Sequence, residues 1–280
     1  MRVKRLQLIS FEPKATQYAR AFSLTEVLIA MGILAVAMVF IAGLFPTAIY
    51  FSTVATERTI AAAAADEAFA KIRLYGIKFN AAAWPDINDP AVYNHCVDYN
   101  DVSPNDVSPI KVNPEEFLYP SIVYESVNEG KYFWSALCRR LSPDLTKRNV
   151  QVTVFVTRKA GLSTKYYRLD PISKQILPDG LWPVPVPIVV QAAQGNVQVR
   201  INDRSQHSFI NAGSTIVDGL TGSIYRVLRR NGNGLDPEVV VLERPWLGDS
   251  RIDAQIWVVP PPVGGGRYPG IAVYQKVLRF

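Results

Sequence analysis

The chain has few of the residues that hold metals or cross-link small folds. Its 280 residues include two cysteines, Cys96 and Cys138, and two histidines, His95 and His207. His95 and Cys96 are adjacent, but no second ligand pair stands at the spacing of a zinc site, so we predict no metal site. Two cysteines are too few for a disulfide framework. They leave two readings open, namely two free thiols or one bridge on the oxidising side of a membrane.

The sequence also lacks the short motifs of common enzymes. No Gly-x-Ser-x-Gly elbow, phosphate-binding loop or dinucleotide fingerprint occurs, and the run Gly264-Gly265-Gly266 lacks the strand-to-helix context of such loops. Glu115 and Glu116 are adjacent, so their side chains point apart rather than flanking a scissile bond. We therefore expect neither an enzyme nor a bound cofactor.

Charge is missing from one long stretch. From Val27 to Thr56 the chain has 30 consecutive uncharged residues, more than the roughly 20 that a helix needs to cross a bilayer core. This stretch predicts a membrane helix. Its N-terminal edge carries one carboxylate, Glu26, which is costly to bury in lipid unless a cation neutralises it. Taken alone, Glu26 favours the interpretation of a carboxylate at the cytoplasmic interface that extends to the headgroups.

The charge that is present is unevenly distributed. The formal net charge is +6, and the segment before Ala21 contributes +4 of it through five basic residues against the single Glu12. A basic segment that precedes an apolar one stays in the cytoplasm, so we interpret this charge as a topology signal. No basic stripe with interleaved aromatic residues follows, and we expect no nucleic-acid partner.

Between the basic leader and the apolar run lies the stretch Ala21-Phe22-Ser23-Leu24-Thr25-Glu26-Val27-Leu28. This order of a small residue, an aromatic residue, a short apolar and hydroxyl stretch and a glutamate resembles the processing site of type IV prepilins, where glycine is commoner at the first position. The resemblance implies cleavage between Ala21 and Phe22 by a prepilin peptidase, and methylation of the new amine of Phe22. It also implies that Glu26 pairs with the N-terminal amine of a neighbouring subunit in a filament, which supplies the cation that the carboxylate needs.

The apolar run is expected to continue into an amphipathic helix. Pro46 removes one backbone donor and predicts a kink, after which residues 53–75 have an alanine-rich pattern with interspersed charges. Gly76 is a suitable stop. We therefore predict one long helix over residues 22–76, with its membrane part over residues 22–45.

A pilin-like β head is expected to follow over residues 77–170, beginning with a long loop rich in turn formers. Three strands are predicted, over Ser121–Val127, Tyr132–Arg139 and Val150–Arg158, with a hairpin turn at Asn128-Glu129-Gly130. The alternating valines of the last strand lie on one face, at Val150, Val152, Val154 and Val156. An antiparallel sheet packed on the amphipathic helix would bury both apolar faces, and the family resemblance implies the same α+β fold.

A second, small all-β unit is expected after a proline-rich linker over residues 171–190. An edge strand over Ser163–Leu169 precedes the linker, and residues 191–280 contain six short strand patterns divided by glycine and asparagine turns. The last of these patterns covers Ile271–Leu278. Short strands at this spacing predict a small barrel or sandwich as a C-terminal domain.

Two groups of residues allow a binding role. Asp98, Asn100 and Asp101 have the oxygen-rich composition of a calcium ligand set, but they lack EF-hand spacing, and a solvated turn is the preferred interpretation. The five tryptophans could form a surface for sugar or peptide, although buried strand aromatics are commoner. They are Trp84, Trp134, Trp182, Trp246 and Trp257.

The sequence thus favours a structural protein. The first hypothesis is a subunit, minor because of its large head, of a type IV pilus or a type II secretion pseudopilus, similar to modification-type minor pilins. It would be a single-pass protein of the bacterial cytoplasmic membrane, with its N-terminus in the cytoplasm and its head on the periplasmic side. Its expected partners are the prepilin peptidase, other pilin or pseudopilin subunits and the membrane. The alternative is a membrane-anchored envelope binding module that does not assemble, and a membrane-anchored enzyme ranks third.

Overall fold

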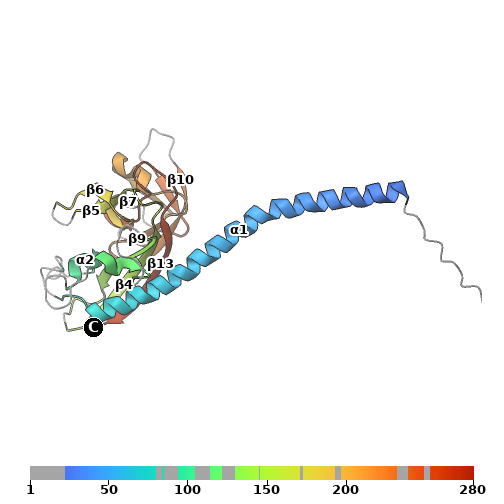
Figure 1. The fold of residues 1–280 in the computed structure, drawn as a ribbon. Coiled ribbons are helices and arrows are strands. Elements are labelled where there is room, and N and C mark those ends of the chain that lie inside the picture. Colours follow the sequence, from blue (N-terminus) through green and yellow to red (C-terminus); the bar gives the residue numbers. More distant parts are fainter. Residues whose placement is uncertain are drawn as a thin grey trace, which may run out of the picture. The chain divides into compact units, whose positions relative to one another are not determined.

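A computed structural model describes residues 23–79, 84, 94–104, 114–121, 130–144, 146–170, 173–192, 197–231, 239–248 and 253–280. The chain divides into two compact units, Met1–Val54 and Ala55–Phe280. Helix α1 (Leu24–Tyr75) begins in the first unit and ends in the second, where it is followed by strands (Figure 1). The architecture is α+β, with a long apolar N-terminal helix, an antiparallel sheet and a six-stranded barrel.

In the first unit, α1 starts at a polar cap and runs through apolar residues. The Ser23 hydroxyl accepts a hydrogen bond from the Glu26 amide at 3.2 Å, and the Ser23 carbonyl accepts one from the Val27 amide at 3.2 Å. A serine in this position satisfies an amide that would otherwise lack a partner in the first turn. The helix continues on both sides of Pro46, as predicted.

In the second unit, α1 buries one face against the sheet. The buried apolar residues recur every three or four positions, at Ala61, Ala64, Ala65, Ala68, Phe69 and Ile72. Alanine has a small side chain and the highest helix propensity, so this face both stabilises the helix and lets its backbone approach the sheet closely. The helix ends at Tyr75, and the following Gly76 has a φ of +82°, which favours glycine, and donates its amide to the Ile72 carbonyl at 2.9 Å. The predicted stop is confirmed.

The sheet that receives this helix is antiparallel throughout. Its three long strands are β3 (Tyr132–Arg140), β4 (Asn149–Arg158) and β13 (Gly270–Arg279), and the short strands β1 (Val97–Asp98) and β2 (Leu118–Tyr119) both pair with β3. The four alternating valines of β4 are buried in one cluster with the alanine face of α1, which confirms the predicted strand and its face. The strand predicted over Ser121–Val127 and its hairpin turn lie almost wholly outside the described residues.

The second β structure is a closed barrel. Its strands follow the order β10-β11-β8-β7-β12-β9 around the ring, and the hairpin of β5 (Tyr166–Leu169) and β6 (Ile176–Gly180) lies before it in the chain. The barrel strands are β7 (Val186–Ala192), β8 (Gln198–Ile201), β9 (Thr215–Asp218), β10 (Ile224–Asn231), β11 (Val239–Leu242) and β12 (Ala254–Val258). Three short helical segments complete the described elements: α2 (Tyr99–Val102), η1 (Pro114–Phe117) and η2 (Arg204–Phe209).

Two expectations about this region were wrong. Residues 171–190 are not an extended linker, because they contain β6 and the start of β7. Pro187 is accommodated in β7 because β8 pairs only with the last three residues of that strand, so Pro187 has a ladder neighbour on one side alone. The last strand, β13, does not belong to the second β unit, because it pairs with β4 over its whole length. A closed ring leaves no edge for another strand. β3 occupies only one edge of β4, so the other edge of β4 can pair with β13.

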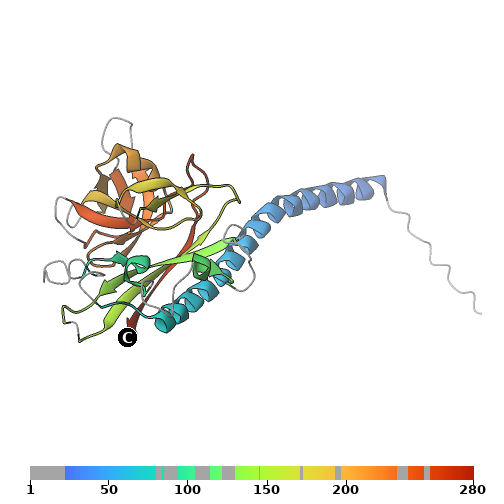
Figure 2. The same cartoon turned by 60° about the vertical axis from the view of Figure 1, so that its left-hand side comes forward.

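The barrel is therefore an insertion between β4 and β13, and it contacts the face of the sheet opposite to α1 (Figure 2). Leu137 and Phe155 of the sheet share a buried cluster with Val217, Trp257 and Val259. Polar contacts surround this cluster at the turn after β9. The Arg139 Nε donates to the Leu220 carbonyl at 2.7 Å, and the Gln275 Nε2 donates to the Gly222 carbonyl at 2.8 Å.

Candidate functional site

The N-terminal part of α1 is the first candidate site. Of the predicted processing residues, Ala21 and Phe22 lie outside the described residues, and Glu26 lies in the first turn of the helix. Its position three residues after the capping Ser23 places its carboxylate near the positive end of the helix dipole, which stabilises a negative charge. Among the described residues no cation lies within ion-pair distance of Glu26.

The apolar surface of this part of α1 has no cover within the described chain. Every large apolar side chain from Leu24 to Phe51 is exposed, including Val39 at 72% and Phe40 at 70%. The helix is long and apolar enough to cross a membrane. A helix that is apolar all round needs lipid or other helices as its surroundings, because exposure of this much apolar surface to water is unfavourable.

Three threonine side chains of the helix have hydrogen-bond partners in the preceding turn. The hydroxyls of Thr47, Thr53 and Thr59 donate to the backbone carbonyls of Leu44, Ile49 and Ala55 at 3.0, 2.9 and 3.1 Å. Such bonds to the preceding turn remove the need for water, so these threonines are compatible with an apolar environment.

A buried carboxylate ties α1 to the head, and the sequence analysis did not identify it. Glu57 is 8% exposed and makes ion pairs with Arg158 of β4 and, at 3.5 Å, with Arg267. The sequence did carry a signal for its burial, because Glu57 stands four residues before Ala61 and so lies on the same, buried face of α1. Its charge partners come from segments more than 100 residues away, which the sequence pattern does not reveal.

The two cysteines are free thiols in the structure, and both are buried. Cys138 faces α1, whereas Cys96 belongs to the cluster on the barrel side of the sheet, so their side chains lie on opposite faces. Burial raises the pKa of Cys96 to about 12, and it also raises the pKa of Cys138. Of the two readings that the sequence left open, the structure has the free thiols.

The oxygen-rich run has a local structural role. The Asp98 carboxylate caps α2, accepting from the amide of Asn100 at 2.9 Å and from its side-chain nitrogen at 3.0 Å. Asp101 makes an ion pair with Lys174 at 3.4 Å. Within the described residues no group of three or more histidine, cysteine, aspartate or glutamate side chains is arranged to hold a metal.

Comparison with known proteins places the N-terminus in a recognised class. Residues 17–42 match the family described as the prokaryotic N-terminal methylation motif. This match and the long apolar helix together support a type IV pilin-like protein. The motif points to a structural protein rather than an enzyme. No curated protein and no solved structure matches the chain.

Proposed function

We propose that the protein is a minor subunit of a type IV pilus or a type II secretion pseudopilus, assembled through the N-terminal part of α1. The observation that carries this proposal is an uncovered apolar helix that begins at a methylation motif and has one carboxylate, Glu26, in its first turn. The same helix anchors the subunit in the cytoplasmic membrane before assembly, with the leader in the cytoplasm and the head on the periplasmic side.

Assembly follows from the chemistry of this helix end. Cleavage between Ala21 and Phe22 by the prepilin peptidase creates an amine, which is then methylated and keeps its positive charge. In a filament this ammonium lies beside Glu26 of a neighbouring subunit. A subunit out of register leaves both charges unpaired in an apolar environment, so the pair selects one register. The inserted barrel enlarges the head, which fits a subunit present in few copies better than a repeating one.

The experiment is N-terminal mass spectrometry of the protein purified from membranes of its native host. We expect the mature chain to begin at methylated Phe22. An intact leader, or cleavage elsewhere, contradicts the proposal and favours a membrane-anchored binding module that does not assemble.

A charge-removing variant tests the assembly step separately. Glu26→Gln keeps the shape of the side chain, so it should be processed normally but should be lost from the sheared filament or pseudopilus fraction. Asp66→Asn is the matched control, because it removes another α1 carboxylate that is well exposed. Equal incorporation of the two variants would contradict a role for Glu26 in assembly.

A further inference from the structure

A cavity of about 210 Å³ lies in the second unit, and its walls come from three parts of the head. They are α1, the end of β4 with the beginning of β13, and the strands β9 and β10 of the barrel. Phe155, Val259 and Val273 form an apolar part of the wall. The volume is below the range of about 300 to 1,000 Å³ that is typical of drug-sized ligands, so the cavity suits a small group or one end of a larger molecule.

Two exposed arginines line this cavity, Arg58 from α1 and Arg226 from β10. Neither makes an ion pair with a carboxylate of the described residues. Glu243 is close in the backbone, because its amide donates to the Arg226 carbonyl at 2.9 Å, but the two side chains form no ion pair. Two guanidinium groups without a carboxylate attract an anion to the cavity.

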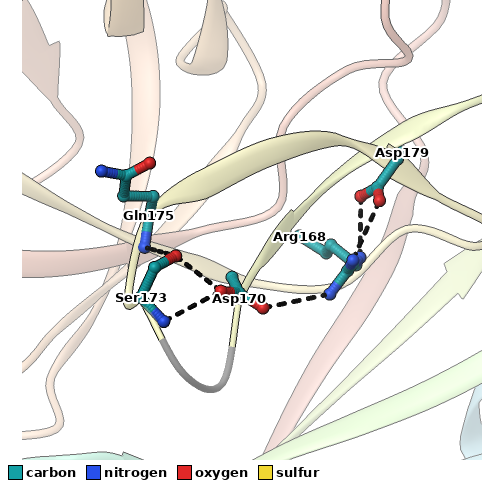
Figure 3. Close-up of polar contacts among 5 residues, drawn as sticks. All are labelled: Arg168, Asp170, Ser173, Gln175 and Asp179. Carbon is teal, nitrogen blue, oxygen red and sulfur yellow. Dashed lines mark hydrogen bonds and ion pairs between the residues drawn. The ribbon is translucent and has the colours of Figure 1, made fainter.

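Another arginine of the head shows the contrasting arrangement. The Arg168 guanidinium is held by Asp179 in a two-bond contact of 2.7 and 2.9 Å and approaches Asp170 at 3.9 Å (Figure 3). Its charge is therefore neutralised within the chain. The charges of Arg58 and Arg226 remain available to another molecule.

The surroundings of the cavity add further positive charge. Glu57, which precedes Arg58, is the one described carboxylate that pairs with both Arg158 and Arg267. Arg267 precedes Tyr268, whose side chain is part of the cavity wall. One carboxylate shared by two guanidinium groups leaves a positive excess, which adds to the charges in the wall itself.

The position of Arg58 in the chain relates the cavity to the membrane. The uncharged run Val27–Thr56 has 30 residues, or about 45 Å of helix at 1.5 Å per residue, and a bilayer with its headgroups is about 40 to 45 Å thick. With Glu26 at the headgroups of one leaflet, Arg58 reaches the headgroups of the other. Tyr50 and Phe51 then lie near the edge of the hydrocarbon core, where aromatic residues are common.

We propose that this cavity binds the phosphate of an anionic phospholipid, with Arg58 and Arg226 donating hydrogen bonds to its oxygens. A guanidinium group matches phosphate geometry, and a lipid headgroup is already concentrated at the level of Arg58. A zwitterionic lipid is a poorer ligand, because the positive excess repels its ammonium group. The inference rests on the membrane anchoring of α1 in the proposed function but not on filament assembly. The bound lipid would hold the head against the membrane surface before assembly.

The test uses the full chain in micelles of lauryl dimethylamine oxide. Dioleoylphosphatidylglycerol, dioleoylphosphatidylcholine and inorganic phosphate are the probes, and native mass spectrometry over a titration counts the bound lipids and gives their affinity. We expect phosphatidylglycerol to bind at least tenfold more tightly than phosphatidylcholine. The double variant Arg58→Gln/Arg226→Gln should weaken phosphatidylglycerol binding about tenfold, because it removes both charges from the wall.

Arg73→Gln/Arg229→Gln is the matched control, because it removes two exposed arginines from the same helix and the same strand, outside the cavity. It should leave lipid binding unchanged. If the cavity variant fails to fold, as judged by its thermal unfolding, Arg226→Gln alone should still weaken binding severalfold.

Three results would overturn the proposal: equal binding of phosphatidylglycerol by the two double variants, equal binding of the two lipids, or displacement of the lipid by an equal concentration of inorganic phosphate. Reconstitution into lipid nanodiscs separates this proposal from the proposed function. A chain that does not insert into nanodiscs contradicts both, whereas a chain that inserts but does not select phosphatidylglycerol contradicts only the lipid site.

Discussion

At the scale of single residues, two carboxylates on one helix have opposite surroundings. Glu57 is buried and has Arg158 and Arg267 as charge partners within the chain. Glu26 is exposed, and no cation among the described residues pairs with it. A buried carboxylate that has its partners contributes to the stability of the head, whereas a carboxylate without one is available to another molecule. Glu57 therefore acts within the chain, whereas the proposed function assigns Glu26 to association with another subunit.

Glu57→Ala should destabilise the head by about 2 to 4 kcal/mol, because it leaves Arg158 partly buried without its carboxylate. Thermal or denaturant unfolding of the full chain in micelles measures this loss. Asp66→Ala is the control, since its ion pair with Lys276 is exposed on both sides and should contribute less than about 1 kcal/mol. Similar losses for the two variants would mean that Glu57 does not act as a buried partner.

Asp98 should make stability depend on pH between about 4 and 6. Burial raises its pKa to about 6, although the hydrogen bonds from Asn100 lower it to a smaller extent. The folded protein then keeps a proton that the unfolded chain releases, so stability falls as the pH rises through this window. Asp98→Asn still caps α2 but does not titrate. A melting temperature measured from pH 4 to pH 7 should decline for the native chain relative to this variant, and parallel curves would contradict the assignment.

At the scale of elements, the sequence predicted those parts whose signal is local. The uncharged run, the alanine-rich pattern and Gly76 predicted α1, and the alternating valines predicted the buried face of β4. The sheet to which Ile271–Leu278 belongs could not be predicted. An alternating pattern of apolar residues predicts a strand but not the strand with which it pairs. Residues 171–190 were misread because proline usually interrupts strands, and Pro187 lies where the ladder is one-sided. The cavity beside Arg58 depends on segments that are distant in the chain, and no sequence pattern indicates that they meet.

The alanine face of α1 gives a prediction at this scale. Ala64→Leu should destabilise the head by about 1 to 3 kcal/mol, because the added atoms have no room between the helix and the sheet. Ala62→Leu is the control on the exposed side of the same turn and should change stability little. Unfolding of both variants by denaturant measures the difference. Equal stability of the two would mean that the helix does not pack closely on the sheet.

At the scale of the whole molecule, the barrel and the sheet are joined at a turn that requires glycine. Gly222 has a φ of +69°, and a Cβ there would lie 3.1 Å from the Arg139 Cδ and from the Gln151 side chain. These neighbours have little freedom to move, because the Arg139 Nη1 donates to the Gln151 Oε1 at 2.7 Å and its Nε donates to the Leu220 carbonyl. The contact between the barrel and the sheet therefore requires a residue without a side chain at position 222.

Gly222→Ala should destabilise the head by about 1 kcal/mol more than Gly213→Ala does. Gly213 has a similar φ of +86°, but a Cβ there meets nothing within 4 Å, so it isolates the backbone strain common to both variants. Thermal unfolding with a barrel probe and a sheet probe measures the effect. If both variants lose the same stability, contact of the new Cβ with Arg139 and Gln151 does not restrict the turn.

The pairing of β13 with β4 also means that the barrel and the head sheet need different parts of the chain. The head sheet contains β3 and β4 and receives its third long strand from Gly270–Arg279, and the Phe280 amide donates to the Arg148 carbonyl at 3.0 Å. The barrel can close without β13, because all six of its strands precede Gly270 in the chain. A chain that stops before β13 leaves β4 with an open edge, which favours aggregation. A chain that lacks β13 can therefore form the barrel but cannot complete the head sheet.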